Sequence, residues 1–381
     1  MRRFIPVFIF LIAIGFTGCG NWLRGDYHSV EPHKESDYAG VSDNIVAKDY
    51  SQLREAMVDL VESGAESGMI FIPGFSADQI EEYTKNAVEY VTKNHSVGAY
   101  AVNNISFDQG TYLGQKALSV SISYNHNRAE ILRIKYAADP DQAVQRVIDA
   151  LVDCESSVVF RIGAMDRIDF SQRVRDYMDT HPQDCMELPQ VTVNYYPEKG
   201  NDRVVEVIFT YQTSTETLRT MQKTVQTIFS SSTLYVSTDA APMEKYAQLY
   251  AFLMERFQYT VETSITPSYS LLRHGVGDSK AFATVFAAMC QEAGLDCNVV
   301  TGTKDGIAHY WNVIFYDGYY FHLDLLKCNL EGSFTLKTAS SMDGYVWDYS
   351  VYSEAEPPTS EPPTSETTTS QTEITETGNI D

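Results

Sequence analysis

The sequence is poor in basic residues, with 28 Lys and Arg against 51 Asp and Glu and a formal net charge of −23. A chain this acidic is repelled by the phosphates of nucleic acids and by anionic lipid surfaces. We therefore expect no nucleic-acid partner. Hydrophobic residues make up 44% of the chain, so the scarcity of positive charge does not indicate an unfolded protein.

Cysteine is also scarce, with six in 381 residues. No two cysteines have the CxxC spacing typical of a zinc site, and we predict neither a metal nor a cofactor. Cys19 is followed by an odd number of further cysteines, which cannot all be paired within the chain. We expect most of these to be buried thiols, and a disulfide between Cys297 and Cys328 is an alternative. They are Cys154, Cys185, Cys290, Cys297 and Cys328.

The sequence lacks an N-terminal apolar segment long enough for a typical membrane-spanning helix. The apolar run IPVFIFLIAIGF, residues 5–16, is shorter than the roughly 20 residues that cross a bilayer, and it follows Arg2 and Arg3. The run leads into FTGC, residues 16–19, which resembles the lipidation site of bacterial lipoprotein signals, with Cys19 as the lipidated residue. The resemblance implies a lipid-anchored protein on the extracytoplasmic face of the cell membrane. The alternative is an ordinary signal peptide or membrane anchor.

The rest of the chain predicts an α+β fold with several domains. Two segments share the order helix–strand–helix–strand–strand, and SISYNHNRAEI in the first matches IFTYQTSTETL in the second. We interpret them as two repeat modules for display or binding, since neither carries a catalytic constellation; chance similarity is the alternative. The predicted boundaries are a signal peptide at 1–18, a spacer at 19–45, modules at 46–137 and 138–215, a third domain at 216–350, and a disordered Pro/Thr/Ser/Glu tail at 351–381.

The third domain holds the residues that suggest chemistry. In GVGDSKAFATVFAAMCQEAGL, residues 275–295, a glycine turn leads into an apolar helix that begins near Ser279 and ends at Gly294. AHYWNVIFYDGYYFHLDLL, residues 308–326, predicts a hairpin with Asp-Gly at its turn. His309 falls on its first strand and Asp324 on its second. A hydroxyl at a helix N-terminus, with a His and an Asp on adjacent strands, has the outline of a catalytic triad.

These two segments resemble the core of the transglutaminase-like superfamily, whose fold is related to papain-type cysteine proteases. The family pattern G-x-G-D-C-x-x-x-A corresponds to GVGDSKAFA, and the H-A-W-N and Y-x-x-D segments correspond to HYWN and FHLD without a gap. The resemblance covers residues 240–348 and implies that Ser279 occupies the position of the catalytic cysteine. It implies that His309 is the base and Asp324 its orienting carboxylate. The fold class expected is two α+β modules followed by a papain-like, transglutaminase-like domain.

Serine at the nucleophile position changes the expected activity. A helix N-terminus and a neighbouring His stabilise a thiolate, but a hydroxyl is too weak an acid to be ionised in this way. We favour an inactive remnant; a working serine nucleophile and a purely structural serine are the alternatives. Cys290 lies well inside the predicted helix, and the gapless register excludes it as a nucleophile. A metal held by His309, His322 and Asp324 is a further alternative that we do not favour.

We therefore expect a membrane-anchored surface protein whose degenerate domain binds a peptide, a protein or the stem peptide of peptidoglycan. The principal alternative is an acyl-transfer enzyme, a peptidase or transglutaminase type, with Ser279 as nucleophile, His309 as base and Asp324 as orienting group. A passive surface spacer is a third possibility. The observation that would discriminate most among these functions is whether Ser279 Oγ, His309 and Asp324 converge on an open groove.

Overall fold

The computed structural model describes residues 45–163, 167–260 and 267–352. These divide into two compact units: residues 45–93 and 101–131 form unit 1, and residues 94–100 and 132 onward form unit 2. Cys19, with nearly all of the predicted spacer and tail, lies outside the described residues. Within the described ranges, no helix combines the length and the apolar character needed to cross a bilayer.

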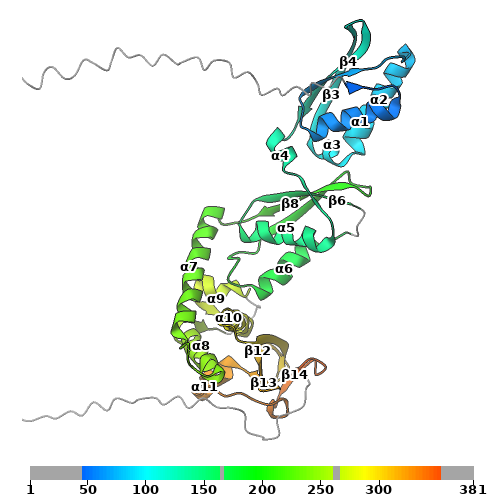
Figure 1. Ribbon diagram of the computed structural model, residues 1–381. Helices are drawn as coiled ribbons and strands as arrows, with labels where there is room; N and C mark the ends of the chain where they lie inside the picture. The colour runs from blue at the N-terminus through cyan, green and yellow to red at the C-terminus, as the bar shows by residue number, and fades with distance from the viewer. Residues whose placement is uncertain (1–44, 164–166, 261–266, 353–381) are drawn as a thin grey trace, which may run out of the picture. The chain divides into compact units, whose positions relative to one another are not determined.

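Unit 1 is a four-stranded sheet with helices on one face (Figure 1). The strand order is β1-β2-β4-β3, with β1 parallel to β2 and the other neighbours antiparallel. On β4, Leu118, Val120 and Ile122 are buried and alternate with exposed serines, which is the pattern of a strand with one buried face. The elements are β1 (Ile45–Val46), α1 (Tyr50–Glu62), β2 (Ser67–Phe71), α2 (Ala77–Lys93), β3 (Val102–Tyr112), β4 (Gln115–Tyr124) and α4 (Arg128–Leu132), whose last residue falls in unit 2.

The first part of unit 2 repeats this arrangement. Its sheet has the order β5-β6-β8-β7, with β5 parallel to β6 and the other pairs antiparallel. The predicted α+β class and the repeated order of elements are therefore confirmed. The elements are β5 (Lys135–Ala137), α5 (Pro140–Val152), β6 (Ser157–Ile162), α6 (Phe170–Thr180), β7 (Gln190–Tyr196) and β8 (Arg203–Thr210).

One short helix differs from the sequence prediction. From its sequence, the stretch AYAVNNISF, residues 99–107, is expected to be a strand from its start, but its first three residues complete the helix α3 (Ser96–Ala101), and β3 begins only at Val102. By its contacts α3 belongs almost entirely to unit 2. Ser96 Oγ donates a hydrogen bond to Asp202 Oδ2 at 2.8 Å, and the Tyr100 ring lies edge-on to Tyr196 at 5.3 Å.

The second part of unit 2, which spans the residues predicted as a third domain, packs around the helix α10. Helices α7, α8 and α9 contact α10, and so do strands β11 and β12 of a sheet with the order β13-β12-β11-β14 (Figure 1). Phe282, Val285 and Phe286 of α10 are at most 1% exposed in this core. The elements are α7 (Thr215–Tyr235), α8 (Pro242–Arg256), β9 (Gln258–Tyr259), α9 (Tyr269–His274), β10 (Val276–Gly277), α10 (Ser279–Glu292), β11 (Cys297–Lys304), β12 (Ile307–Tyr316), β13 (Tyr319–Leu323), α11 (Leu325–Glu331), η1 (Ala339–Ser341) and β14 (Tyr345–Trp347).

The predicted hairpin is present, with one difference at its end. Asp317 and Gly318, at φ of 51° and 84°, form the two-residue turn between β12 and β13. Asp324 was predicted on the second strand, but β13 ends at Leu323, and Asp324 instead caps the N-terminus of α11. Its side chain accepts hydrogen bonds from backbone N–H groups of that helix, which is the reason that the strand stops there.

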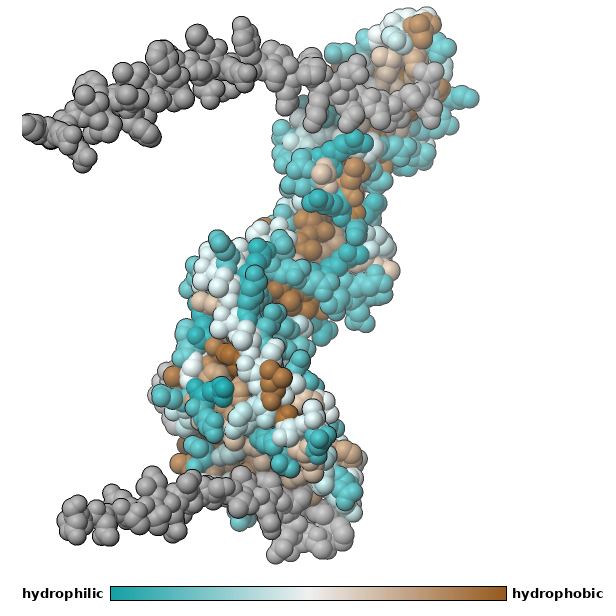
Figure 2. Space-filling model, turned by 60° about the vertical axis from the view of Figure 1, so that its left-hand side comes forward, coloured by the Kyte–Doolittle hydropathy of each residue, from teal (hydrophilic) through white to brown (hydrophobic). Residues whose placement is uncertain are grey.

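The described cysteines are buried and one face of the surface is largely hydrophilic (Figure 2), as the composition of the chain led us to expect. All five cysteines in the described ranges are buried free thiols, so the alternative disulfide between Cys297 and Cys328 is wrong. Figure 2 shows a largely hydrophilic face with separate apolar patches.

Candidate functional site

Ser279 is the first residue of α10, and the preceding loop fixes its position. Asp278 is the N-cap, and its Oδ1 accepts a hydrogen bond from the Ala281 N–H at 3.0 Å. Gly277 lies close to the helix, because a Cβ added there would be 2.8 Å from the Ala281 Cβ and 3.2 Å from the Leu271 Cδ1. A larger residue at 277 would push the loop away from α9 and α10, so the glycine sets where the Ser279 hydroxyl lies.

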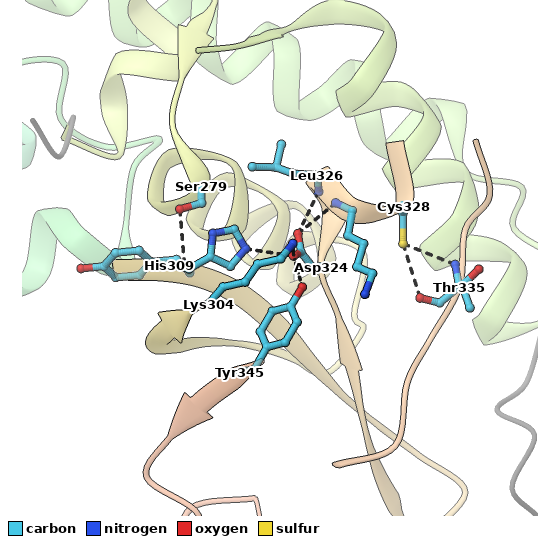
Figure 3. Close-up of polar contacts among 10 residues, drawn as sticks. Ser279, Lys304, His309, Asp324, Leu326, Cys328, Thr335 and Tyr345 are labelled. Carbon is cyan, nitrogen blue, oxygen red and sulfur yellow. Dashed lines mark hydrogen bonds and ion pairs between the residues drawn. The ribbon is translucent and has the colours of Figure 1, made fainter. Parts of the chain in front are cut away.

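Strand β12 brings His309 beside the start of α10. The backbone N–H of Tyr310 donates a hydrogen bond to Ser279 Oγ at 3.3 Å, which ties the strand to the helix. His309 Nε2 bonds to Asp324 Oδ2 at 2.9 Å. The other ring nitrogen, Nδ1, lies on the side of the ring that faces Ser279 (Figure 3). Nδ1 is therefore placed where a base for a residue at position 279 would have to be.

Asp324 is the most connected side chain of the site. Its Oδ2 accepts hydrogen bonds from the Tyr345 hydroxyl at 2.5 Å and from Lys304 Nζ at 3.3 Å, in addition to the bond with His309 (Figure 3). Burial alone would raise the pKa of Asp324, but the hydrogen bonds from His309 and Tyr345 outweigh it and hold that pKa well below its usual range. The carboxylate therefore remains ionised at neutral pH and orients the His309 ring.

The sequence did not predict the contributions of Tyr345 and Lys304. Tyr345 is buried, and its burial and its bond to Asp324 raise the pKa of the phenol, so it acts only as a donor at neutral pH. Lys304 Nζ also lies 5.1 Å from the centre of the Tyr345 ring. Both residues lie outside the two segments, residues 275–295 and 308–326, whose motifs carried the resemblance. Each is a single polar residue on a strand, so no spacing pattern marked it.

The structure brings together Ser279, His309 and Asp324, as the outline of a triad required. The Ser279 hydroxyl accepts a hydrogen bond from the Tyr310 N–H, and among the residues that the structure describes no hydrogen bond joins Ser279 to His309. Ser279 is 9% exposed, so little of the residue is accessible to solvent. The arrangement is a His–Asp pair beside a helix N-terminus, with a hydroxyl where a nucleophile would be.

His322 does not join this cluster. Its Nδ1 accepts a hydrogen bond from Trp311 Nε1 at 3.0 Å, and burial lowers its pKa to about 4, so it is neutral at pH 7. In residues 45–163, 167–260 and 267–352, no group of three His, Cys, Asp or Glu side chains could hold a metal ion.

Cys290 lies in the apolar core of the same domain and is fully buried. Burial raises the pKa of its thiol well above the ordinary value, which makes it a poor nucleophile.

Comparison with known proteins bears on this part of the chain. Residues 231–325 match the model of the transglutaminase-like superfamily, so unit 2 contains a transglutaminase-like domain and the resemblance is confirmed for these residues. The match to a crystal structure of a TGase has 13% sequence identity and a TM-score of 0.26. It covers 68% of this chain and 76% of the TGase chain. Comparison with curated proteins gives no match.

A second solved structure, of a "putative protease" from Parabacteroides distasonis, is 10% identical, with a TM-score of 0.22. The match covers 67% of this chain but only 39% of the other. At these TM-scores neither structure defines the arrangement of the elements described above.

Proposed function

We propose that the transglutaminase-like domain is a catalytically degenerate cleft that binds a peptide, a protein or a cell-wall stem peptide without cleaving it. The observation that carries the proposal is the hydrogen bonding of Ser279. Its hydroxyl oxygen accepts from the Tyr310 N–H at 3.3 Å, and within the described part of the chain it makes no hydrogen bond with His309. A serine without a bound base keeps its proton and is a weak nucleophile.

The size of the side chain explains this geometry. A carbon–oxygen bond is shorter than a carbon–sulfur bond, so the Ser279 oxygen lies closer to the start of α10 than the sulfur of a cysteine would. A cysteine here would also gain from the helix N-terminus and from His309, which stabilise a thiolate. Serine gains neither benefit, because its hydroxyl is not ionised at neutral pH.

The survival of the His309–Asp324 pair does not require catalysis. Asp324 caps α11 and accepts the Tyr345 hydroxyl, so it connects α11 to β14 whether or not a reaction takes place. His309 is one of its partners, and replacing either residue would leave buried polar groups unsatisfied. The pair therefore serves the fold of a binding domain as well as it would serve an enzyme.

The test is the reactivity of position 279. A serine-directed fluorophosphonate should not label Ser279 in the purified protein. Ser279→Cys should react with iodoacetamide at about pH 6 at least about tenfold faster than Ser230→Cys, an exposed control position on α7, because His309 and the helix N-terminus lower the thiol pKa. His309→Ala in the Ser279→Cys background should remove this difference. The five native cysteines in the described ranges are buried, so they contribute little to the background.

The alternative is an acyl-transfer enzyme, and one observation favours it. Nδ1 of His309 faces Ser279 while Nε2 is bonded to Asp324, which is the orientation that a base needs. Phosphonate labelling at Ser279 that disappears in His309→Ala would replace the degenerate cleft with this enzyme. An alkylation rate in Ser279→Cys equal to that of Ser230→Cys would show that the three groups do not act together and would contradict both functions.

The location of the protein is part of the same proposal. FTGC at residues 16–19 supports lipidation at Cys19 and attachment to the extracytoplasmic face of the membrane. The acidic composition supports an anchor made of lipid, because the chain itself has little attraction for anionic lipid.

A further inference from the structure

A pocket of about 220 Å³ lies beside the start of α10. Helix α6, helix α9 and the first turn of α10 contribute to its walls, and Met178, Leu188 and Pro267 form its apolar part. Lys280, the residue after Ser279, is also in the wall. Its Nζ lies 5.9 Å from the centre of the Tyr310 ring, and the N–H of Tyr310 is bonded to Ser279. The pocket is thus connected to the candidate cleft in two ways. Lys280 follows Ser279 on α10, and Tyr310, which follows His309 on β12, lies near Lys280.

The polar groups of the pocket favour a negatively charged ligand. Lys280 Nζ pairs with Asp179 Oδ2 at 2.9 Å, so these two charges offset each other. Arg175 donates from Nε and Nη2 to the side-chain oxygen of Gln172 at 3.2 and 2.8 Å, and no carboxylate in the described ranges pairs with it. One positive charge therefore remains uncompensated in the pocket wall.

Tyr269 adds a hydrogen-bond donor. Its hydroxyl oxygen accepts from the Leu188 N–H at 3.4 Å, which leaves the hydroxyl proton to be donated. A guanidinium and a phenol beside an apolar wall match a carboxylate on a short apolar stem, because the stem covers the wall while the carboxylate meets the two donors. In a chain with a net charge of −23, such a site attracts a carboxylate that most of the protein would repel.

We propose that this pocket binds a carboxylate of the peptide that occupies the Ser279–His309 cleft, either an acidic side chain or a C-terminus. The peptide class rests on the proposed function; the preference for a carboxylate rests on Arg175 and Tyr269 alone. The pocket sets specificity, and its position beside Lys280 places the bound carboxylate on the α6 side of Ser279.

Two matched pairs of small probes test the inference on the purified full chain by ligand-observed NMR titration. Benzoylglycine and benzoylglycinamide represent a C-terminus with and without its charge, and acetyl-glutamyl amide and acetyl-glutaminyl amide do the same for a side chain. We expect the charged member of one pair to bind at least about threefold more tightly than its amide, and that pair identifies the source of the carboxylate. Equal affinities within both pairs would overturn the inference.

Charge variants of α6 locate the binding. Arg175→Gln should abolish the preference for the carboxylate, and Asp179→Asn should increase it, because it frees Lys280 from its partner. Arg173→Gln, an exposed position on the same helix outside the pocket, should change neither affinity. A preference that persists in Arg175→Gln, or that falls equally in Arg173→Gln, would show that the pocket is not the site.

A last comparison separates this inference from the function it builds on. If the charged probes bind in an Arg175-dependent way but no acidic peptide slows alkylation of Ser279→Cys, the pocket stands and the peptide cleft fails. If acidic and neutral peptides protect Ser279→Cys equally, the cleft stands and the pocket fails as a specificity site.

Discussion

At the scale of single residues, Asp324 determines the site more than Ser279 does. It bonds His309, Tyr345 and Lys304 through one oxygen and caps α11 through the other. The side chain of Asp324 is only 4% exposed, so each of these bonds is shielded from water. Loss of the charge would affect three strands and one helix at once.

Asp324→Asn should therefore lower the free energy of unfolding by about 3 kcal/mol near pH 7, since it leaves buried partners without their counter-charge. The folded-state pKa of Asp324 is held below that of the unfolded chain. Its stabilisation is therefore fully present above the ordinary pKa of about 4 and is lost as pH falls below it. Urea unfolding at a series of pH values from about 2 to 7 measures this loss of stability. The acid limb, which is the fall in the free energy of unfolding at low pH, should be flatter for the variant than for the parent. Asp343→Asn, at an exposed position, is the control and should leave both the free energy and the acid limb unchanged.

The sequence could locate the three central residues because a gapless motif carries them. It could not locate Tyr345, which reaches Asp324 from a strand of only three residues that pairs with β11. Nor could it place Asp324 at a helix start, because the seven-residue α11 is too short to show a helical period. Such contacts depend on tertiary packing between segments, which local pattern does not encode.

At the scale of elements, the local sequence was sufficient to predict a helix end wherever that end carries a capping signal. Ser76 and Gln79, three residues apart in the sequence at the start of α2, form a capping box with reciprocal hydrogen bonds of 2.9 and 3.2 Å. Gly294, predicted to end α10, has a φ of 73° just beyond the helix. The parallel edge strands β1 and β5, of two and three residues, were not predicted because alternation cannot be read in so few positions.

Gly302 links the sheet to the site. It lies opposite His309 on β12 and opposite Trp347 on β14. A Cβ at this position would overlap the carbonyl oxygen of Val346 and would lie 2.7 Å from the Trp311 ring. We expect Gly302→Ala to lower the free energy of unfolding by about 2 kcal/mol or more, because backbone and a buried indole have to move.

The matched control is Gly110→Ala on β3, where an added Cβ meets nothing within 4 Å. It should be neutral or slightly stabilising, because alanine is less flexible than glycine in the unfolded chain. Urea unfolding of both variants measures the difference. A Gly302→Ala protein as stable as Gly110→Ala would mean that β14 is not held tightly against β11.

At the scale of the whole molecule, unit 2 joins the second module to the transglutaminase-like domain. Arg273 on α9 donates to the carbonyl oxygen of Met186 at 2.8 Å and to Thr213 Oγ1 at 3.1 Å, and it pairs with Glu187 at 3.4 Å. The side chains of Arg273 and Glu187 are only 19% and 11% exposed. The interface is thus bonded internally, and the two parts should unfold together.

Arg273→Met should lower the free energy of unfolding of unit 2 by about 3 kcal/mol, because Glu187 would lose its partner inside the protein. Calorimetry of the parent should show one transition for unit 2, and the variant should shift it to lower temperature. Arg173→Met, at an exposed position on α6, should leave the transition in place. Separate melting of the second module and the transglutaminase-like domain in the parent would contradict this coupling.

The anchoring proposal also belongs to this scale. Cys19→Ala should leave the signal uncleaved or release the protein from the membrane fraction, since lipidation and cleavage both need the thiol. Membrane fractionation and mass spectrometry of the N-terminus measure the two outcomes. A Cys19→Ala protein that fractionates and matures like the parent would exclude the lipoprotein.

Helix α3 has a consequence for how this protein can be rearranged, by evolution or by design. The chain passes between the units three times, after residues 93, 100 and 131, because α3 is inserted from the middle of unit 1. A gene fragment that begins at residue 132 omits Ser96, whose hydroxyl bonds Asp202 beside its ion pair with Arg161. It also omits Tyr100, which covers the ring of Tyr196. Unit 2 can therefore be transplanted intact only together with unit 1, or with residues 94–100 supplied as a separate peptide, so the two units should be inherited as a pair and not shuffled independently.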